Sequence, residues 1–146
     1  MPDYASPQQI KQTAATVFPL ELRDDRIQAF FGADPFFYLP TLQQMQEFLH
    51  YNVNLPPVDL GTGFDCDDYA YAVKGSIGLW NRNHAHVQAS WCVGVIFARF
   101  AWMGNVEHAA NWFIDKAGLL HLIEPQTRQH YPPGAIAPKS IKLLLM

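Results

Sequence analysis

The sequence has few cysteines, few charged residues and no long hydrophobic run, and each scarcity excludes a class of protein. Two cysteines, Cys66 and Cys92, are too few for a disulfide framework in a chain of 146 residues. Charged residues make up 16% and the formal net charge is -3, so no basic surface favours nucleic acid or an anionic membrane. The longest apolar run, roughly residues 91–102, contains Arg99 and is too short to cross a bilayer.

What the sequence does contain is typical of a packed globular chain. Hydrophobic residues make up 49% and aromatic residues 14%, which predicts a single domain over residues 1–146. The N-terminal MPDYASPQQ has neither a basic nor an apolar segment, so we expect no signal peptide and cytosolic residence. Small molecules or proteins are the expected partners, and nothing indicates an oligomeric state.

Helical patterns come first in the chain and extended patterns follow. Ser6 and Pro7 predict a helix start, Thr41 predicts a second, and apolar residues at helical spacing predict a third that begins at Cys66. Four runs rich in β-branched, aromatic or aliphatic residues then predict strands: WCVGVIFARF, VEHAANWFI, LLHLIE and SIKLLLM. This order predicts an α+β fold, with N-terminal helices packed on a C-terminal antiparallel sheet.

The stretch GFDCDDYAYAVKG, residues 63–75, places a thiol at the start of the third predicted helix. Unpaired N–H groups and the helix dipole stabilise a thiolate at such a position. The charges of Asp65, Asp67 and Asp68 oppose the thiolate unless a cation or an imidazolium offsets them. Because carboxylate oxygens suit calcium, we expect Asp67 and Asp68 to be the ligands of a possible calcium site, and no other cofactor is required.

His108 and Glu124 lie on consecutive predicted strands, joined by a turn that contains Gly118. Side chains alternate between the two faces of a sheet, so these two residues share a face only if even-numbered residues pair with even-numbered ones. A three-residue turn closed by a glycine bulge gives that register, whereas an even-length loop does not.

These motifs together resemble the transglutaminase-like branch of the papain-like superfamily. The residues that carry the resemblance are FDCDDYA at 64–70, HAAN at 108–111 and IEPQT at 123–127. The Cys-to-His distance and the glutamate are similar to those of the calcium-dependent peptidase domain of a mushroom lectin, and FDCDDYA is similar to small bacterial transglutaminase-like peptidases. The resemblance implies a papain-like or transglutaminase-like core with a Cys-His-Glu triad.

The resemblance further implies a cysteine hydrolase that cleaves peptide or other amide bonds through a thioester. Cys66 would be the nucleophile, His108 the base and Glu124 the group that orients it, with Asn111 and Gln126 as supporting residues. A peptide or protein would be the substrate. Two alternatives stay open: acyl transfer at the same triad, and an inactive binding or structural module with the same fold.

One departure from the papain pattern favours the inactive alternative. Papain-type enzymes carry an oxyanion-hole glutamine several residues before the cysteine, and Leu60 stands there. For two further residues we expect no role in chemistry, since Cys92 lies inside an apolar strand and His121 alternates with leucines as a surface or half-buried residue.

Overall fold

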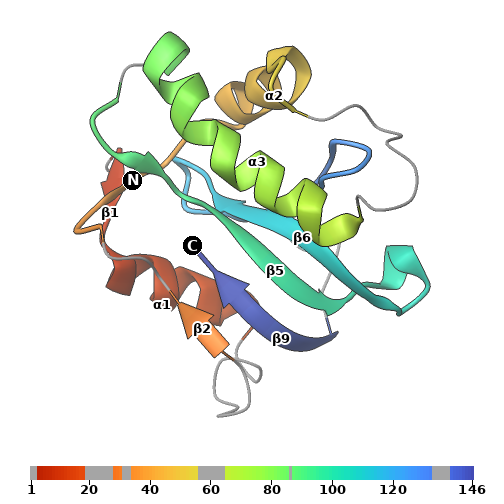
Figure 1. The fold of residues 1–146 in the computed structure, drawn as a ribbon. Helices are drawn as coiled ribbons and strands as arrows, with labels where there is room; N and C mark the ends of the chain where they lie inside the picture. The colour runs from red at the N-terminus through yellow and green to blue at the C-terminus, as the bar shows by residue number, and fades with distance from the viewer. Residues whose placement is uncertain (1–2, 19–27, 31–33, 56–64, 86, 133–138) are drawn as a thin grey trace.

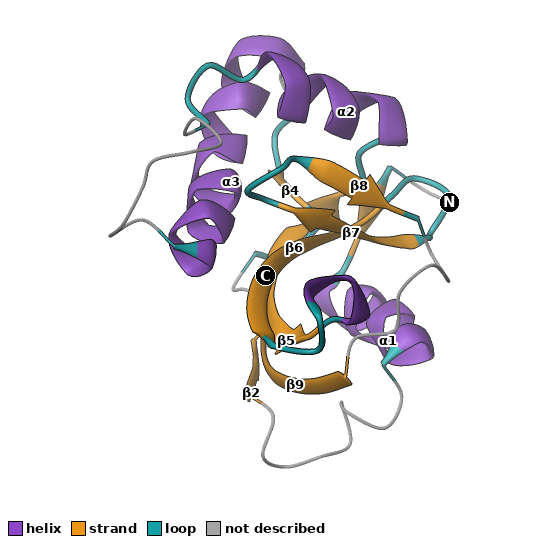
Figure 2. Ribbon diagram, turned by 90° about the vertical axis from the view of Figure 1, so that its right-hand side faces the viewer, coloured by secondary structure: helices purple, strands orange, loops and turns teal. Residues whose placement is uncertain are grey.

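A computed structural model describes residues 3–18, 28–30, 34–55, 65–85, 87–132 and 139–146. Helices lie on both faces of a curved sheet: α2 and α3 cover one face and α1 packs against the other (Figures 1 and 2). The helices are α1 (Pro7–Val17), α2 (Leu42–Tyr51) and α3 (Cys66–Trp80), and α3 continues into a π-helical turn at Asn81–Ala85.

The described strands form two sheets. The smaller sheet has the order β1-β3-β4, and the larger has the order β2-β9-β5-β6-β7-β8. The strands of the smaller sheet are β1 (Tyr4–Ala5), β3 (Phe37–Tyr38) and β4 (Ser90–Trp91). Those of the larger are β2 (Gln28–Phe30), β5 (Val93–Arg99), β6 (Glu107–Ile114), β7 (Leu120–Glu124), β8 (Gln129–Tyr131) and β9 (Lys139–Leu145).

The expected architecture of one C-terminal antiparallel sheet is wrong. The N-terminal β2 joins the larger sheet at its edge and pairs with β9 in parallel, and β3 pairs in parallel with β4. Both pairings join segments far apart in the sequence, and periodicity within a segment carries no information about such a partner. The four C-terminal runs do form strands, but chain segments from the N-terminal third complete both sheets.

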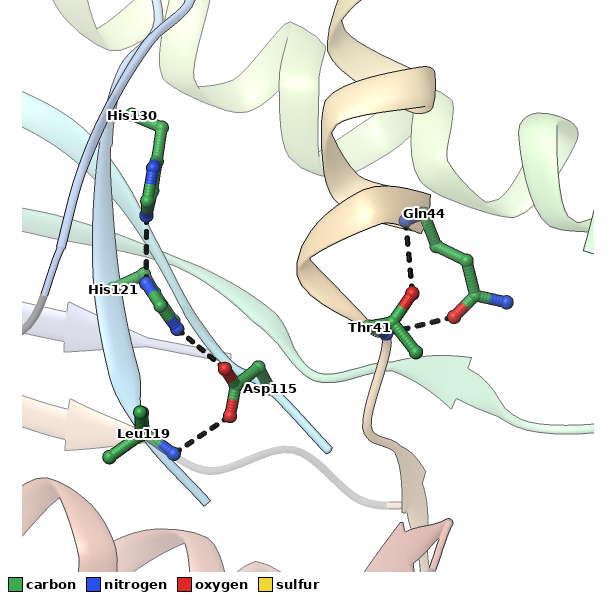
Figure 3. A network of polar contacts seen from close by, with 6 residues as sticks. All are labelled: Thr41, Gln44, Asp115, Leu119, His121 and His130. Atoms are coloured by element: carbon green, nitrogen blue, oxygen red, sulfur yellow. Dashed lines mark hydrogen bonds and ion pairs between the residues drawn. The ribbon is translucent and has the colours of Figure 1, made fainter. Parts of the chain in front are cut away.

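The first two helix starts are confirmed at the level of individual hydrogen bonds. The Ser6 hydroxyl accepts from the Gln9 N–H, and the Gln9 side-chain oxygen accepts from the Ser6 N–H. Thr41 and Gln44 form the same reciprocal pair at the start of α2 (Figure 3). Each capping box satisfies two donors that the first turn of a helix leaves unpaired.

The faces of the central strands alternate, and the alternation decides where the site residues point. Odd-numbered residues of β6 such as Ala109 and Phe113 pack toward α2 and α3, whereas Ala110 and Trp112 pack into the core that α1 covers. The β6–β7 register pairs Asn111 with Ile123, odd with odd. His108 and Glu124 therefore share the even face, the one turned away from α3.

The β6–β7 turn reaches this register by another route than the one expected. Ile114 pairs with Leu120, so five residues connect the strands in place of three, and Gly118 adopts a positive φ of 81° as anticipated. An odd-length connection preserves the even-with-even pairing. No helix among the described residues combines the length and the apolar content needed to cross a membrane.

Candidate functional site

His108 and Glu124 form a buried side-chain hydrogen bond on the even face of the sheet. The His108 Nε2 lies 2.5 Å from the Glu124 Oε2, and the two residues are 5% and 3% exposed. The other carboxylate oxygen of Glu124 accepts the backbone N–H of Gln126 at 3.0 Å. The expected contact between the histidine and the glutamate is confirmed, and Gln126 supports it through its backbone.

Cys66 lies on the other side of the sheet from this pair. It is half-buried at the first position of α3 and packs with Ala70, Val95 and Ala109, which belong to the odd face. Among the residues that the structure describes, no hydrogen bond joins Cys66 to His108. The His108 ring instead packs edge-on against Phe100. The structure thus brings His108 and Glu124 together, and their expected site with Cys66 stays a prediction.

Three aspartates surround the thiol at the start of α3. Asp65, Cys66 and Asp67 are, among the described residues, the one group of three or more His, Cys, Asp or Glu side chains that could hold a metal ion. Their ligand atoms all lie within 4.8 Å of one another. Asp68 is engaged elsewhere, because its Oδ2 accepts the Asp65 N–H at 3.2 Å. The two carboxylates of the group suit calcium, but the thiol does not, so a calcium ion there would draw most of its oxygen ligands from other groups.

The same crowding affects the acidity of Asp65. A side-chain hydrogen bond that the protonated Asp65 makes to Asp67, and then burial and the charges of Asp67 and Asp68, raise the pKa of the Asp65 carboxyl above its ordinary value. Like charges that share a small space disfavour each other's ionisation. Calcium binding at Asp67 and Asp68 stays a prediction.

Asn111 ties α3 to the sheet. Its side-chain amide donates to the Ala70 carbonyl in α3 at 2.9 Å and to the Gly94 carbonyl in β5 at 3.0 Å. The residue is fully buried, and its Oδ1 has no hydrogen-bond partner among the residues that the structure describes. These contacts give Asn111 a structural task, and it lies on the face opposite to His108.

Cys92 is a buried core residue, as its apolar strand indicated. Burial raises the pKa of the Cys92 thiol to about 12, so this thiol stays protonated near neutral pH. Cys92 therefore provides an inert internal reference for the reactivity of Cys66.

A groove of about 630 Å³ lies between α2 and the segment that joins β7 to β8. The α2 residues that line the groove include Gln43, Gln46, Glu47, His50 and Tyr51. The other wall carries Thr127, Arg128 and His130. Cys66, His108 and Glu124 are not among the lining residues, so the groove is separate from the expected catalytic residues.

Behind the groove runs a chain of hydrogen bonds between titratable side chains (Figure 3). The Asp115 Oδ2 lies 2.8 Å from the His121 Nε2, and the His121 Nδ1 lies 2.7 Å from the His130 Nε2. The Asp115 Oδ1 accepts the Leu119 N–H at 2.9 Å, which anchors the carboxylate in the β6–β7 turn.

The expected surface position of His121 is wrong. His121 is 3% exposed, and its ring stacks on Phe113 with the centroids 4.6 Å apart. Alternation with Leu120 and Leu122 suggested an outward side chain, but in a sheet covered on both faces either position is inside. The sequence signal that could have placed His121 correctly is strand parity. His121 is odd-numbered like Phe113, its partner in the β6–β7 pairing, and the two residues therefore share a buried face.

Two solved structures have a similar fold. One, described as a PSL1a-E64 complex, aligns with a TM-score of 0.74 at 19% identity, covering 99% of this chain and 51% of the other. The second is the Polyporus squamosus lectin bound to Neu5Aca2-6Galb1-4GlcNAc, a human-type influenza-binding epitope. It aligns with a TM-score of 0.71 at 19% identity and covers 99% and 50% of the two chains. This chain thus spans about half the length of either one.

These structural matches correct the expected fold. The architecture matches about half of each of these chains, and the expected papain-like or transglutaminase-like core is wrong. A search of curated protein sequences found no match.

The family match corrects the expected function as well. The sequence profile of the Agglutinin C-terminal family matches residues 38–130, well over half of the chain. The assignment to the transglutaminase-like peptidases, with its cysteine-hydrolase activity and peptide substrate, was wrong: a Cys-His-Glu order across three elements was weaker evidence than a match over 38–130. The chain belongs to the Agglutinin C-terminal family.

Proposed function

We propose that this chain is the C-terminal part of a glycan-binding agglutinin and that its groove between α2 and β8 binds carbohydrate. The observation that carries the proposal is the family match, because residues 38–130 contain every residue that lines the groove. A similar chain, the Polyporus squamosus lectin, is described in complex with a sialylated trisaccharide. The partner proposed here is accordingly a glycan rather than a peptide.

The lining of the groove has the chemistry that a polyhydroxylated ligand needs. Amide, carboxylate, guanidinium and imidazole groups offer both donors and acceptors for hydroxyls. Tyr51 is 65% exposed at the end of α2 and offers an aromatic surface for an apolar face of a sugar ring. A few placed polar groups around an aromatic wall are typical of small-ligand sites.

The proposal is tested by calorimetric titration with Neu5Aca2-6Galb1-4GlcNAc and with a panel of neutral oligosaccharides. Tyr51→Ala is expected to weaken binding about tenfold or more, since it removes an aromatic contact worth about 1 kcal/mol together with its buried area. Tyr71→Ala is the matched control, because Tyr71 is also an exposed helical tyrosine but does not line the groove. Absence of binding to every glycan, or equal weakening by both variants, would refute the groove as a carbohydrate site.

A second candidate function rests on the thiol. The similar chain PSL1a is described in complex with E64. We propose that Cys66, half-buried at a helix N-terminus, is the residue through which this chain would take up a thiol-directed ligand of that kind. His108 and Glu124 lie on the other face of the sheet, and a shared site of these two residues with Cys66 stays a prediction.

Intact-mass measurement after incubation with E64, and separately with iodoacetamide, tests this site. One adduct is expected at Cys66, absent from Cys66→Ser, while Cys92 stays unmodified because its thiol is protonated and buried. Repeating the reaction with calcium tests the proposed site at Asp67 and Asp68, since a bound cation would offset their charges and raise the rate. A Cys66 as unreactive as Cys92 in all conditions would remove the thiol from the proposed sites.

Cytosolic residence also stays a proposal.

A further inference from the structure

β8 is a short edge strand whose place on the larger sheet depends on its side-chain contacts. It has three residues, Gln129–Tyr131, and lies beside β7 at the end of the strand order. The turn before it includes Arg128 with a positive φ of 60°, a conformation that costs a bulky residue free energy. A short edge strand that follows a strained turn opens at lower cost than the central strands of the same sheet.

His130 provides the contact of β8 with the interior. Its Nε2 lies 2.7 Å from the His121 Nδ1, and the His121 Nε2 lies 2.8 Å from the Oδ2 of the buried Asp115 (Figure 3). On the opposite face of the strand, the Tyr131 ring stacks on Trp102 with the centroids 4.7 Å apart. The histidine contact is therefore the part of this anchorage that changes charge near neutral pH.

The His121–His130 contact has room for one hydrogen. Two ring nitrogens 2.7 Å apart form a hydrogen bond only when one of them carries a hydrogen and the other offers a lone pair. One positive charge on the two rings is balanced by the Asp115 carboxylate, which accepts from the Nε2 of His121. A second proton makes both rings imidazolium, places a hydrogen on each of the facing nitrogens and brings two like charges together. The hydrogen bond is lost at that step.

His130 is the ring that moves when the contact breaks. His121 is 3% exposed and stacks on Phe113, whereas His130 is partly exposed and belongs to the edge strand. Burial, and then the neighbouring His121, lower the pKa of His130 from its ordinary value, against the opposite influence of Asp115. The other charged or titratable side chains that line the same groove are Glu47 and His50 from α2 and Arg128 from the turn before β8.

We propose that the His121–His130 contact is an acid-sensitive device that holds β8 on the sheet: when the two rings take up a second proton, the contact breaks and β8 separates from β7. The inference goes beyond the proposed function, since it concerns a wall of the groove and holds whatever the groove binds. The turn before β8 also carries the Gln126 N–H that Glu124 accepts. Opening of β8 therefore weakens the support of the carboxylate that pairs with His108.

Acidification is the direction that opens β8. A histidine whose pKa is lower in the closed strand than in the open one binds more protons in the open state. The closed state has its full advantage above the ordinary histidine pKa of about 6.5, and it loses this advantage as the pH falls from there through the lowered pKa of His130. Uptake of one proton changes the opening equilibrium by at most about tenfold per pH unit.

Hydrogen exchange of the backbone amides, followed by NMR from about pH 8 to about pH 5, tests the proposal without any ligand. After correction for intrinsic exchange rates, protection of the Gln129–Tyr131 amides is expected to fall by up to about tenfold per pH unit as the His130 ring signals titrate. The amides of β5 and β6 are expected to keep their protection over the same range. Protection of β8 that stays constant while His130 protonates would overturn the proposal.

His130→Gln separates this cause from other titrations. The glutamine amide can donate to or accept from the His121 Nδ1 and takes up no proton, so β8 should keep its protection down to about pH 5. His50→Gln is the matched control, because His50 is an exposed histidine in the same groove and its loss should leave the pH dependence of β8 unchanged. The same pH dependence in His130→Gln as in the wild type would assign the opening to another group and overturn the proposal. The wild-type titration decides the question if the variant does not fold.

Discussion

Asn111→Asp is expected to lower the free energy of unfolding by about 3 kcal/mol or more at pH 7. The substitution keeps the shape of the side chain but replaces the amide that donates to the Ala70 and Gly94 carbonyls. A carboxylate there faces two acceptors in a fully buried site, so both hydrogen bonds are lost and a charge is left without a partner. Denaturant unfolding followed by tryptophan fluorescence measures the loss.

The pH dependence of this variant gives a second check. Burial raises the pKa of the introduced carboxyl in the folded state above its unfolded value, so the penalty is present above the folded pKa. The penalty shrinks as the pH falls through the folded pKa toward the unfolded one, because the protonated group can donate one hydrogen bond. Asn105→Asp is the control, an exposed position with a positive φ of 59° where the same change should alter stability by no more than about 0.5 kcal/mol. Equal effects at both positions would contradict the structural task assigned to Asn111.

His108→Ala is expected to destabilise the protein by about 3–5 kcal/mol. It removes the partner of Glu124, whose carboxylate would keep only the backbone N–H of Gln126 at a site that is 3% exposed. A buried carboxyl left without its side-chain partner accounts for most of this loss. The double variant His108→Ala/Glu124→Ala should therefore lose less than the sum of the two single losses, with a coupling energy of about 1–3 kcal/mol.

The exposed ion pair on the neighbouring strands provides the control for this cycle. Arg99 and Glu107 lie 3.7 Å apart, and each side chain is 52% exposed, so Arg99→Ala should cost less than about 1 kcal/mol. If the His108 and Glu124 losses are additive and no larger than that of Arg99→Ala, the pair contributes nothing to stability and its burial has another reason. The rate of Cys66 alkylation in His108→Ala shows in the same preparation whether the histidine influences the thiol at all.

Local features of the fold were predictable because short-range chemistry determines them. Ser6 and Thr41 begin helices since each has a glutamine three residues later that completes a capping box. The β6–β7 hairpin was predictable from two strand patterns and Gly118, whereas the register that brings His108 beside Glu124 depended on a loop length that the sequence left open. Each of these features depends on residues fewer than twenty positions apart.

The parts that could not be predicted depend on partners far away in the chain. Nothing in Gln28–Phe30 indicates that it pairs in parallel with the C-terminal β9. Nor does the order Cys66, His108, Glu124 indicate that a helix start and a strand residue fall on opposite faces of one sheet. The triad was expected from order and element type, which carry no information about side-chain direction, and it stays a prediction.

The Asp115–His121–His130 chain shows the same limit on a smaller scale. The hairpin brings Asp115 to His121, but His130 reaches them only because β8 adds to the sheet beside β7. A histidine between two leucines reads as a solvent-facing residue unless the second covered face of the sheet is known. Residue motifs likewise indicated the wrong family, because similar motifs occur on unrelated proteins and a fold or function needs more than three matching positions.

The most direct test of the account is an NMR titration of the ¹⁵N-labelled chain with Neu5Aca2-6Galb1-4GlcNAc, followed residue by residue. We expect saturable shift changes at the backbone amides of Glu47, Tyr51 and Arg128 and at the His130 ring, with Cys66 and Glu124 unmoved. Shift changes that gather around Cys66, or none anywhere along the chain, would contradict the assignment of the groove as the carbohydrate site.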